Sequence, residues 1–177
     1  MDDLVSHDTI SSSTMILEPY AHPFHRTKIT ENDGNIKFSS KTSLQLVQLS
    51  CLLHNHSTYK GRRDAIQENY YFKQNIPIPI DHRHYICAIP TKSPASPDCI
   101  WVFYSHINKI EIYNNRKQSK LHFYNGTTII VATSFYQMQQ QFLKAGFLLC
   151  RMNMQDSQQF RDIYKVMRLL DKPLLPC

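Results

Sequence analysis

The chain has 177 residues, of which 42% are hydrophobic and 19% are charged, and its formal net charge is +6. This composition predicts one soluble globular domain and excludes a disordered chain, and no apolar stretch approaches the roughly 20 residues of a membrane-spanning helix. The five cysteines have no paired spacing, and no cationic segment with a following apolar run begins the chain. We therefore expect reduced thiols in a cytoplasmic protein.

Charge is unevenly distributed along the chain. The first 20 residues hold four of the 14 acidic side chains and no Lys or Arg, so the remaining residues have 20 basic against 10 acidic side chains. Residues 34–63 and 112–155 contain no carboxylate at all. Acidic small substrates remain an alternative, but a broad positive field favours a long polyanion such as nucleic acid.

The N-terminal part predicts short strands. Residues 1–12 are polar and acidic, and we expect them to be loose. Strands are predicted over residues 15–20, 28–30 and 35–38, with a turn at Asp33-Gly34.

Two helices are predicted next. Thr42 and Gln45 form a capping-box pattern ahead of a helix over residues 43–53. Ser57 or Thr58 can cap a second helix that ends near Asn69.

The second half predicts a sheet followed by helices. The prolines of Ile76-Pro77-Ile78-Pro79-Ile80 lack amide hydrogens and indicate an edge strand or a polyproline-like stretch. A meander is predicted from about Tyr85 to Ala132, with strands over residues 85–89, 99–104, 107–113, 121–124 and 127–132. Ser134 and Gln137 form a second capping box before a helix that covers the sheet. We find no internal repeat.

The predicted fold class is therefore α+β, a single domain in which an antiparallel β-meander packs with flanking α-helices. A last helix, with Arg161, Lys165, Arg168 and Lys172 on its polar face, is predicted before Pro173.

One short basic run gives the first functional hypothesis. In Ser57-Thr58-Tyr59-Lys60-Gly61-Arg62-Arg63, three cations stand beside small hydroxyls and an aromatic ring. Cations there can displace condensed counterions, and the hydroxyls can bond phosphate oxygens. We predict that Lys60, Arg62 and Arg63 contact DNA, with Tyr59 and Trp101 supporting the surface.

A second set of cations lies in or beside a predicted hairpin turn. Arg116, Lys117 and Lys120 are predicted to contact DNA, since a hairpin can enter a groove, although turns are polar in most proteins. The basic face of the last helix can equally be a solvated surface or bind an acidic partner.

Metal and catalytic signals are weak. His54-x-His56 and His82-x-His84 could place imidazoles together, with Cys51 or Cys99 joining them, but there is no CxxC or HExxH pattern. The sequence has no phosphate-binding glycine loop, no nucleophile elbow and no carboxylate cluster, and its cysteines lie in apolar contexts. We expect no enzyme, no metal and no cofactor.

Several short motifs, taken in order, resemble the ComK competence transcription factor family. These are Ser43-Leu44-Gln45-Leu46-Val47 with Ser50-Cys51, Ser57-Thr58-Tyr59 with Gly61-Arg62, Pro77-Ile78-Pro79-Ile80, Pro90-Thr91, Cys99-x-Trp101, Ser105-His106-Ile107, Phe123-x-Asn125-Gly126, and Ser134. The resemblance covers about residues 43–151. It divides the chain into an acidic, partly disordered segment with short strands (1–40), a DNA-binding core (41–152) and an amphipathic basic helix (153–177).

The resemblance implies a bacterial cytoplasmic, nucleoid-associated activator of DNA-uptake genes. Such a protein would bind paired A/T-rich boxes mainly through the minor groove, assemble as a dimer or a dimer of dimers, and be delivered to a Clp protease by an adaptor. Two alternatives remain. One is a LytTR-type domain that reads the major groove, and the other is a protein-interaction module that docks an acidic regulatory partner.

Overall fold

The computed structural model describes residues 9–153. Its helices are α1 (Ser43–Asn55), α2 (Tyr59–Tyr70), the short 3-10 helix η1 (Tyr104–His106) and α3 (Phe135–Asn153). Its strands are β1 (Thr14–Pro19), β2 (Thr27–Glu31), β3 (Ile36–Ser39), β4 (Ile78–Asp81), β5 (Ile86–Pro90), β6 (Trp101–Phe103), β7 (Ile107–Tyr113), β8 (Gln118–Phe123) and β9 (Thr128–Val131). The helix predicted near the C-terminus lies outside the described residues.

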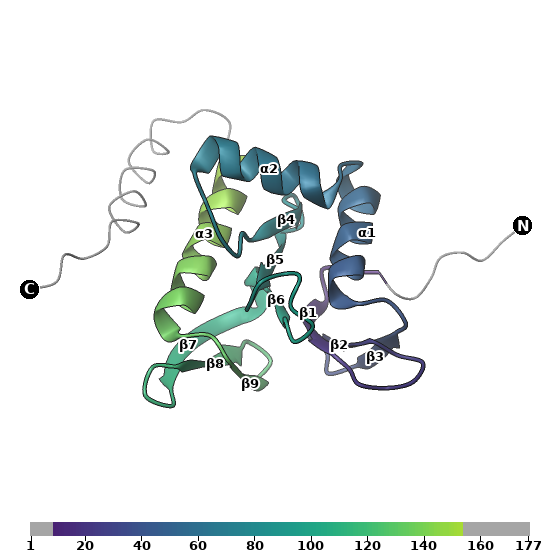
Figure 1. Cartoon of the computed structure of the whole chain (residues 1–177), viewed down its shortest axis with the longest axis vertical. Helices are drawn as coiled ribbons and strands as arrows, with labels where there is room; N and C mark the ends of the chain where they lie inside the picture. The colour runs from purple at the N-terminus through teal and green to yellow at the C-terminus, as the bar shows by residue number, and fades with distance from the viewer. Residues whose placement is uncertain (1–8, 154–177) are drawn as a thin grey trace, which may run out of the picture.

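The strands form two antiparallel sheets, which confirms the α+β class. Six strands follow the order β3-β2-β1-β6-β5-β4, and three follow the order β7-β8-β9 (Figure 1). The predicted single meander is divided, because η1 turns the chain out of the first sheet between β6 and β7. Strand β1 takes the place beside β6, with Leu17 opposite Trp101. The proline-containing β4 lies at the edge, as its missing amide hydrogens predicted.

Two hydrophobic clusters lie on opposite faces of the central strands. On β5, Ala88 belongs to the cluster that α1 and α2 cover, whereas Cys87 and Ile89 belong to the cluster that β7–β9 and α3 cover. Side chains in a strand alternate between faces, so this division places β5 between two cores. On α1, Leu46 and Val47 are fully buried, whereas Leu53 near its end is 54% exposed.

The structure contains a repeat of backbone register that the sequence does not show. Strands β2 and β3 pair Thr27 with Ser39, and strands β8 and β9 pair Ser119 with Val131. Each residue of the second hairpin follows its counterpart by 92 positions. Both hairpins turn at a glycine in the left-handed region, Gly34 with φ 88° and Gly126 with φ 87°. The same register continues over four residue pairs in each hairpin.

The helices that follow the two hairpins begin in the same way. Thr42 accepts from the amide of Gln45 in α1, and Ser134 accepts from the amide of Gln137 in α3. In the first strand of each hairpin, Thr27 Oγ1 donates to Lys41 O at 2.8 Å, and Ser119 Oγ donates to Thr133 O at 2.7 Å. We call β1–β3 with α1 unit 1, and β7–β9 with α3 unit 2. They lie on opposite sides of β5 and β6 (Figure 1).

Candidate nucleic-acid interface

The first predicted site begins α2, and we call Lys60, Arg62 and Arg63 the α2 cluster. Thr58 Oγ1 accepts from the amide of Gly61 at 3.0 Å and caps the helix. A Cβ at Gly61 would stand 3.1 Å from that oxygen, so glycine suits this close approach. Lys60 is exposed, and Arg63 is 43% exposed and paired with Asp64 at 3.1 Å.

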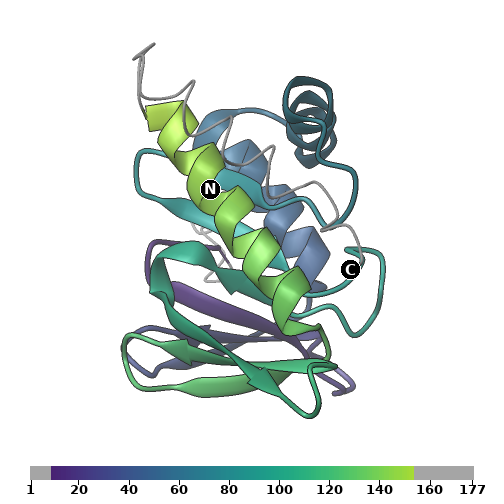
Figure 2. The same ribbon diagram turned by 90° about the vertical axis from the view of Figure 1, so that its left-hand side faces the viewer.

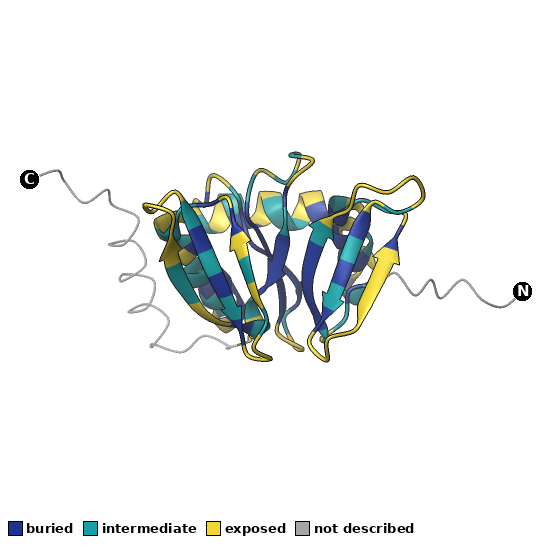
Figure 3. Cartoon of the chain, turned by 90° about the horizontal axis from the view of Figure 1, so that it is seen from below, coloured by how far each residue is buried: buried dark blue, intermediate teal, exposed yellow. Residues whose placement is uncertain are grey.

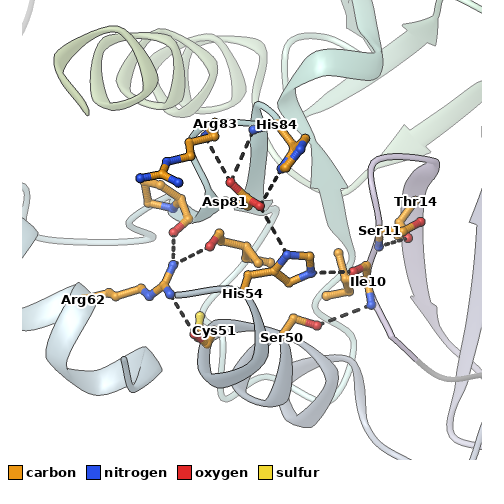
Figure 4. Close-up of polar contacts among 12 residues, drawn as sticks. Ile10, Ser11, Thr14, Ser50, Cys51, His54, Arg62, Asp81, Arg83 and His84 are labelled. Atoms are coloured by element: carbon orange, nitrogen blue, oxygen red, sulfur yellow. Dashed lines mark hydrogen bonds and ion pairs between the residues drawn. The ribbon is translucent and has the colours of Figure 1, made fainter. Parts of the chain in front are cut away.

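Arg62 points into the protein instead of toward solvent. Its Nε donates to Ser57 Oγ at 2.7 Å, and Nη2 donates to Cys51 O at 2.7 Å at the end of α1. Its Nη1 donates to Ile80 O at 2.6 Å and also to Pro79 O (Figure 4). The guanidinium thus joins α1, α2 and the edge strand β4 through backbone carbonyls.

These contacts change the role expected of Arg62. Burial lowers its pKa, while Cys51 and Asp81 act to raise it, and the group keeps its positive charge at neutral pH because an arginine pKa starts so high. A guanidinium engaged with three carbonyls has few donors left for a phosphate. DNA contact by the α2 cluster stays a prediction, but the geometry makes Arg62 a positioning residue within it.

Asp81 connects the same region to the histidines. It accepts from His84 Nδ1 at 2.8 Å and from the amide of Arg83 at 3.0 Å, and His54 Nδ1 lies 3.3 Å from it (Figure 4). Burial raises the pKa of Asp81, but the hydrogen bonds from His84 and His54 outweigh that effect and hold it below its ordinary value. His54 Nε2 also lies 3.0 Å from Ile10 O, so this network holds the chain ahead of β1.

Neither metal nor nucleophile chemistry is assembled in residues 9–153. No three His, Cys, Asp or Glu side chains gather there in an arrangement that could hold a metal ion. Burial raises the pKa of Cys51 to about 11, opposed by Arg62, and burial also raises the pKa of Cys99. Both thiols are protonated at neutral pH and are poor nucleophiles.

An open cleft of about 860 Å³ lies beside the exposed members of the α2 cluster. Lys60, Arg63 and Lys73 line it together with glutamine and asparagine side chains, and no carboxylate is among its lining residues. Sequence reasoning missed Lys73, which lies in a loop after α2 and has no motif around it. This cleft is where the α2 cluster can meet an anion.

The second predicted site is the turn between β7 and β8, and we call Arg116, Lys117 and Lys120 the β7–β8 cluster. Asn114, Asn115 and Arg116 all have positive φ, which is most tolerable for asparagine. Arg116 and Lys117 are exposed at the tip, and Lys120 is half-buried on β8. Across from Lys120, Glu111 is engaged by Lys109 and by His122 at 2.7 Å.

The structure does not bring the two clusters together. In Figure 1, α2 lies along the top of the molecule and the β7–β8 hairpin lies at the bottom.

The two supporting aromatic residues are interior, because Trp101 is 0% and Tyr59 is 9% exposed. They can support a surface only by packing beneath it, and stacking of Tyr59 on a base does not fit its burial.

Sequence reasoning also missed the tip of the β1–β2 hairpin. Arg26 is exposed there, and the ring of Phe24 is 77% exposed. Aromatic rings and imidazoles lie close together at this tip, with the ring centroids of Tyr20 and Phe38 4.8 Å apart and those of His22 and His25 5.1 Å apart. Five aromatic or histidine side chains between residues 20 and 38 were the available signal.

The exposed cations at the start of α2 and at the β7–β8 tip are the groups of this region that can bind an anion. The comparison with protein families gives the particular class. A family model described as ComK protein matches residues 6–157, so the chain belongs to the ComK family of competence transcription factors, which are not enzymes. No curated protein and no solved structure matches the chain.

The family match begins at residue 6, ahead of the motifs over residues 43–151 that resemble the family. It includes all of β1–β3, which form half of the six-stranded sheet. Family membership implies DNA binding. In the described part of the chain, no helix is both long and apolar enough to cross a membrane.

Proposed function

We propose that this chain is a sequence-specific DNA-binding activator of competence genes that binds A/T-rich boxes mainly through the minor groove. The match of residues 6–157 to the ComK family carries the proposal. A narrow A/T-rich minor groove concentrates negative potential and attracts arginine, and among the described residues Arg26, Arg83 and Arg116 are exposed at hairpin tips.

Five cations at or near the surface support this function. In the β7–β8 cluster, Arg116 and Lys117 project from a tip, and Lys120 lies on the adjoining strand. In the α2 cluster, Lys60 and Arg63 line the open cleft. Among the described residues, Lys60, Arg116, Lys117 and Lys120 have no carboxylate partner. Such side chains can release counterions from a phosphate backbone without first breaking an ion pair.

Assembly and turnover follow the family resemblance. We propose that the chain forms a homo-oligomer on DNA, either a dimer or a dimer of dimers, and that an adaptor delivers it to a Clp protease. Sedimentation velocity of the protein with and without a two-box duplex tests the assembly. A single monomer bound per duplex at all concentrations would contradict it.

Fluorescence anisotropy with three duplexes tests the DNA-binding proposal. Phased A/T boxes should bind more tightly than scrambled or G/C-rich duplexes, and a minor-groove competitor should displace the protein. With six or more phosphate contacts, affinity should fall about a thousandfold between 50 and 200 mM salt.

Other results would assign a different function. Displacement by a major-groove competitor alone would indicate the LytTR-type mode. Equal weak binding to all three duplexes, with tight and salt-insensitive binding to a protein, would indicate the interaction module.

A further inference from the structure

The tips of the β1–β2 and β7–β8 hairpins occupy equivalent places in the two units. Glu18 lies opposite Lys28 in the first hairpin, and Glu111 lies opposite Lys120 in the second. Strands β1 and β7, which begin these two hairpins, each have a register shift near their start, after Thr14 and after Ile107. Residues 20–26 and 113–118 form the tips that follow.

The residues that begin the two tips also match. Tyr20 follows β1 and is 39% exposed, and Tyr113 ends β7 and is 42% exposed. Beyond them the tips differ, since the β1–β2 tip is aromatic and the β7–β8 tip is cationic. The two tips share a backbone position and differ in chemistry.

Both hairpins belong to a side of the molecule that no described helix covers. Figure 1 shows β1–β3 and β7–β9 below α1, α2 and α3, and Figure 3 looks at this lower side, with the strands toward the viewer and the helices behind. Figure 2 shows the same layering from the side of α3. Within the sheets, Ile29 and Leu121 are buried, whereas their neighbours Lys28 and Lys120 are half-buried on the opposite faces.

We call the strand face between the two tips the helix-free side. The start of α1 borders it at the β1–β2 tip, because Thr42, Ser43 and Leu44 line one cleft with Tyr20 and Arg26. A long ligand that crosses the strands meets a helix only at this first turn of α1.

Between them, the two tips expose cations and an aromatic ring. Arg116 and Lys117 at one tip and Arg26 at the other are exposed, and within residues 9–153 none of them is paired with a carboxylate. Phe24 has the largest exposed fraction, 77%, among the large hydrophobic side chains of that part of the chain. Its nearest ring partner is His22, with centroids 6.0 Å apart, so the core does not hold it.

The Phe24 tip rests on a supporting group of rings. Tyr20 stacks on His22 at 5.7 Å, and His25 lies 5.8 Å from Phe38 on β3. Phe38 is 41% exposed and lies on the face of β3 that carries its cross-strand neighbour Lys28. An exposed ring on such a base is placed to contact an apolar surface outside the molecule.

We infer that one DNA duplex lies across the helix-free side and is contacted at two separate places by the equivalent tips. The β7–β8 tip binds phosphates through Arg116 and Lys117. The β1–β2 tip binds a phosphate through Arg26 and places the Phe24 ring against a base step or a sugar. This inference rests on the proposed function and specifies where the duplex lies.

A duplex fits these features better than an acidic protein does. It repeats the same phosphate backbone along its length, so two equivalent elements of one chain can meet equivalent groups. It also offers apolar base faces in the minor groove, where inserted rings unstack a step and bend the helix. The partner thus presents both kinds of surface that the two tips require.

Hydroxyl-radical footprinting and anisotropy on one A/T-box duplex test the inference. Wild-type protein should protect distinct backbone positions, of which Arg116→Ala loses one set and Arg26→Ala loses another. Each arginine variant should reduce the salt dependence by about one phosphate contact. Phe24→Ala should weaken binding about tenfold at every salt concentration, because stacking does not release counterions.

Two variants away from this side serve as controls. Tyr71→Asn removes a ring that is 69% exposed at the end of α2, where φ is 57° and asparagine is tolerated. Arg83→Ala removes an exposed arginine in the β4–β5 turn. Both should bind like wild type, and all variants should retain the wild-type melting temperature.

The outcomes separate this inference from the proposed function. If Arg26→Ala and Phe24→Ala bind like wild type while Arg116→Ala is weakened, DNA binding stands and the two-tip contact is overturned. The same holds if both arginine variants lose the same protected positions. If wild-type protein binds no duplex, the proposed function fails and the inference fails with it.

Discussion

The α2 cluster and the β7–β8 cluster are built from the same residue types but use them differently. At the start of α2, the Arg62 guanidinium joins three elements through backbone carbonyls, and Arg63 pairs with Asp64. At the β7–β8 tip, Arg116 and Lys117 are exposed with no carboxylate partner in the described part of the chain. The difference shows that a run of cations can stabilise a fold as readily as it can bind a ligand.

The largest expected effect is on stability, from Arg62→Met. The change keeps the apolar stem but leaves the carbonyls of Cys51 and Ile80 without their charged donor. We expect the free energy of unfolding to fall by about 3 kcal/mol and the melting temperature to fall by about 6 to 12 °C. Urea denaturation followed by circular dichroism measures the loss.

Arg63→Met is the matched control for that experiment. Arg63 is 43% exposed and bonds only its neighbour Asp64 among the residues described, so its removal should change stability by less than about 0.5 kcal/mol. Equal losses for the two variants would contradict the internal role of Arg62.

The next effect concerns Asp81, which belongs to the same region as Arg62. Asp81→Asn should cost about 2 kcal/mol at pH 7, because the charged acceptor for His84 and His54 is lost. The folded-state pKa is depressed, so the stabilisation is fully present above the ordinary value of 3.8 and is lost as the pH falls through the folded pKa.

A stability profile from pH 7 to pH 2 checks this assignment. The wild-type protein should lose stability below about pH 4 more steeply than Asp81→Asn does. Parallel profiles would mean that Asp81 is not held ionised by these contacts.

A smaller effect, on affinity alone, is expected at the β7–β8 cluster. Arg116→Ala and Lys117→Ala should each weaken binding to an A/T-rich duplex about fivefold at 0.1 M salt, without changing the melting temperature. Both side chains are exposed, so the fold does not depend on them. A loss of stability would mean that these side chains stabilise the fold, as Arg62 does, instead of binding a ligand.

The smallest effect is expected from Lys60→Ala in the cleft. Lys60 lines the cleft beside Arg63 and Lys73, at the opposite end of the molecule from the β7–β8 tip. We expect a loss of affinity of about threefold and a lower salt dependence. Unchanged binding and salt dependence would restrict the DNA surface to the hairpin side.

The sequence by itself determined the local elements and the broad chemistry. The capping pairs Thr42–Gln45 and Ser134–Gln137 placed the starts of α1 and α3, because a cap depends on residues three positions apart. Asn125-Gly126 placed the β8–β9 turn, because glycine is favoured where φ is positive. The order of short motifs was enough to identify the family, and the family match extended it.

Only the tertiary structure decided how distant segments combine. The placement of β1 beside β6 joins residues more than 80 positions apart, and strand edges carry no side-chain code for their partner. The repeat was not visible because residues 27–46 and 119–138 share only Lys28 with Lys120, Gly34 with Gly126 and Gln45 with Gln137. The backbone hydrogen bonds that set this register are compatible with many different side chains, so the repeat leaves little trace in the sequence.

The role of Arg62 was hidden for a related reason. Its acceptors are backbone carbonyls of Cys51, Pro79 and Ile80, and every residue has such a carbonyl, so no residue type announces the contact. The cationic composition of the chain was readable from its letters. Which cations face solvent depended on how the edge of β4 and the end of α1 meet in space.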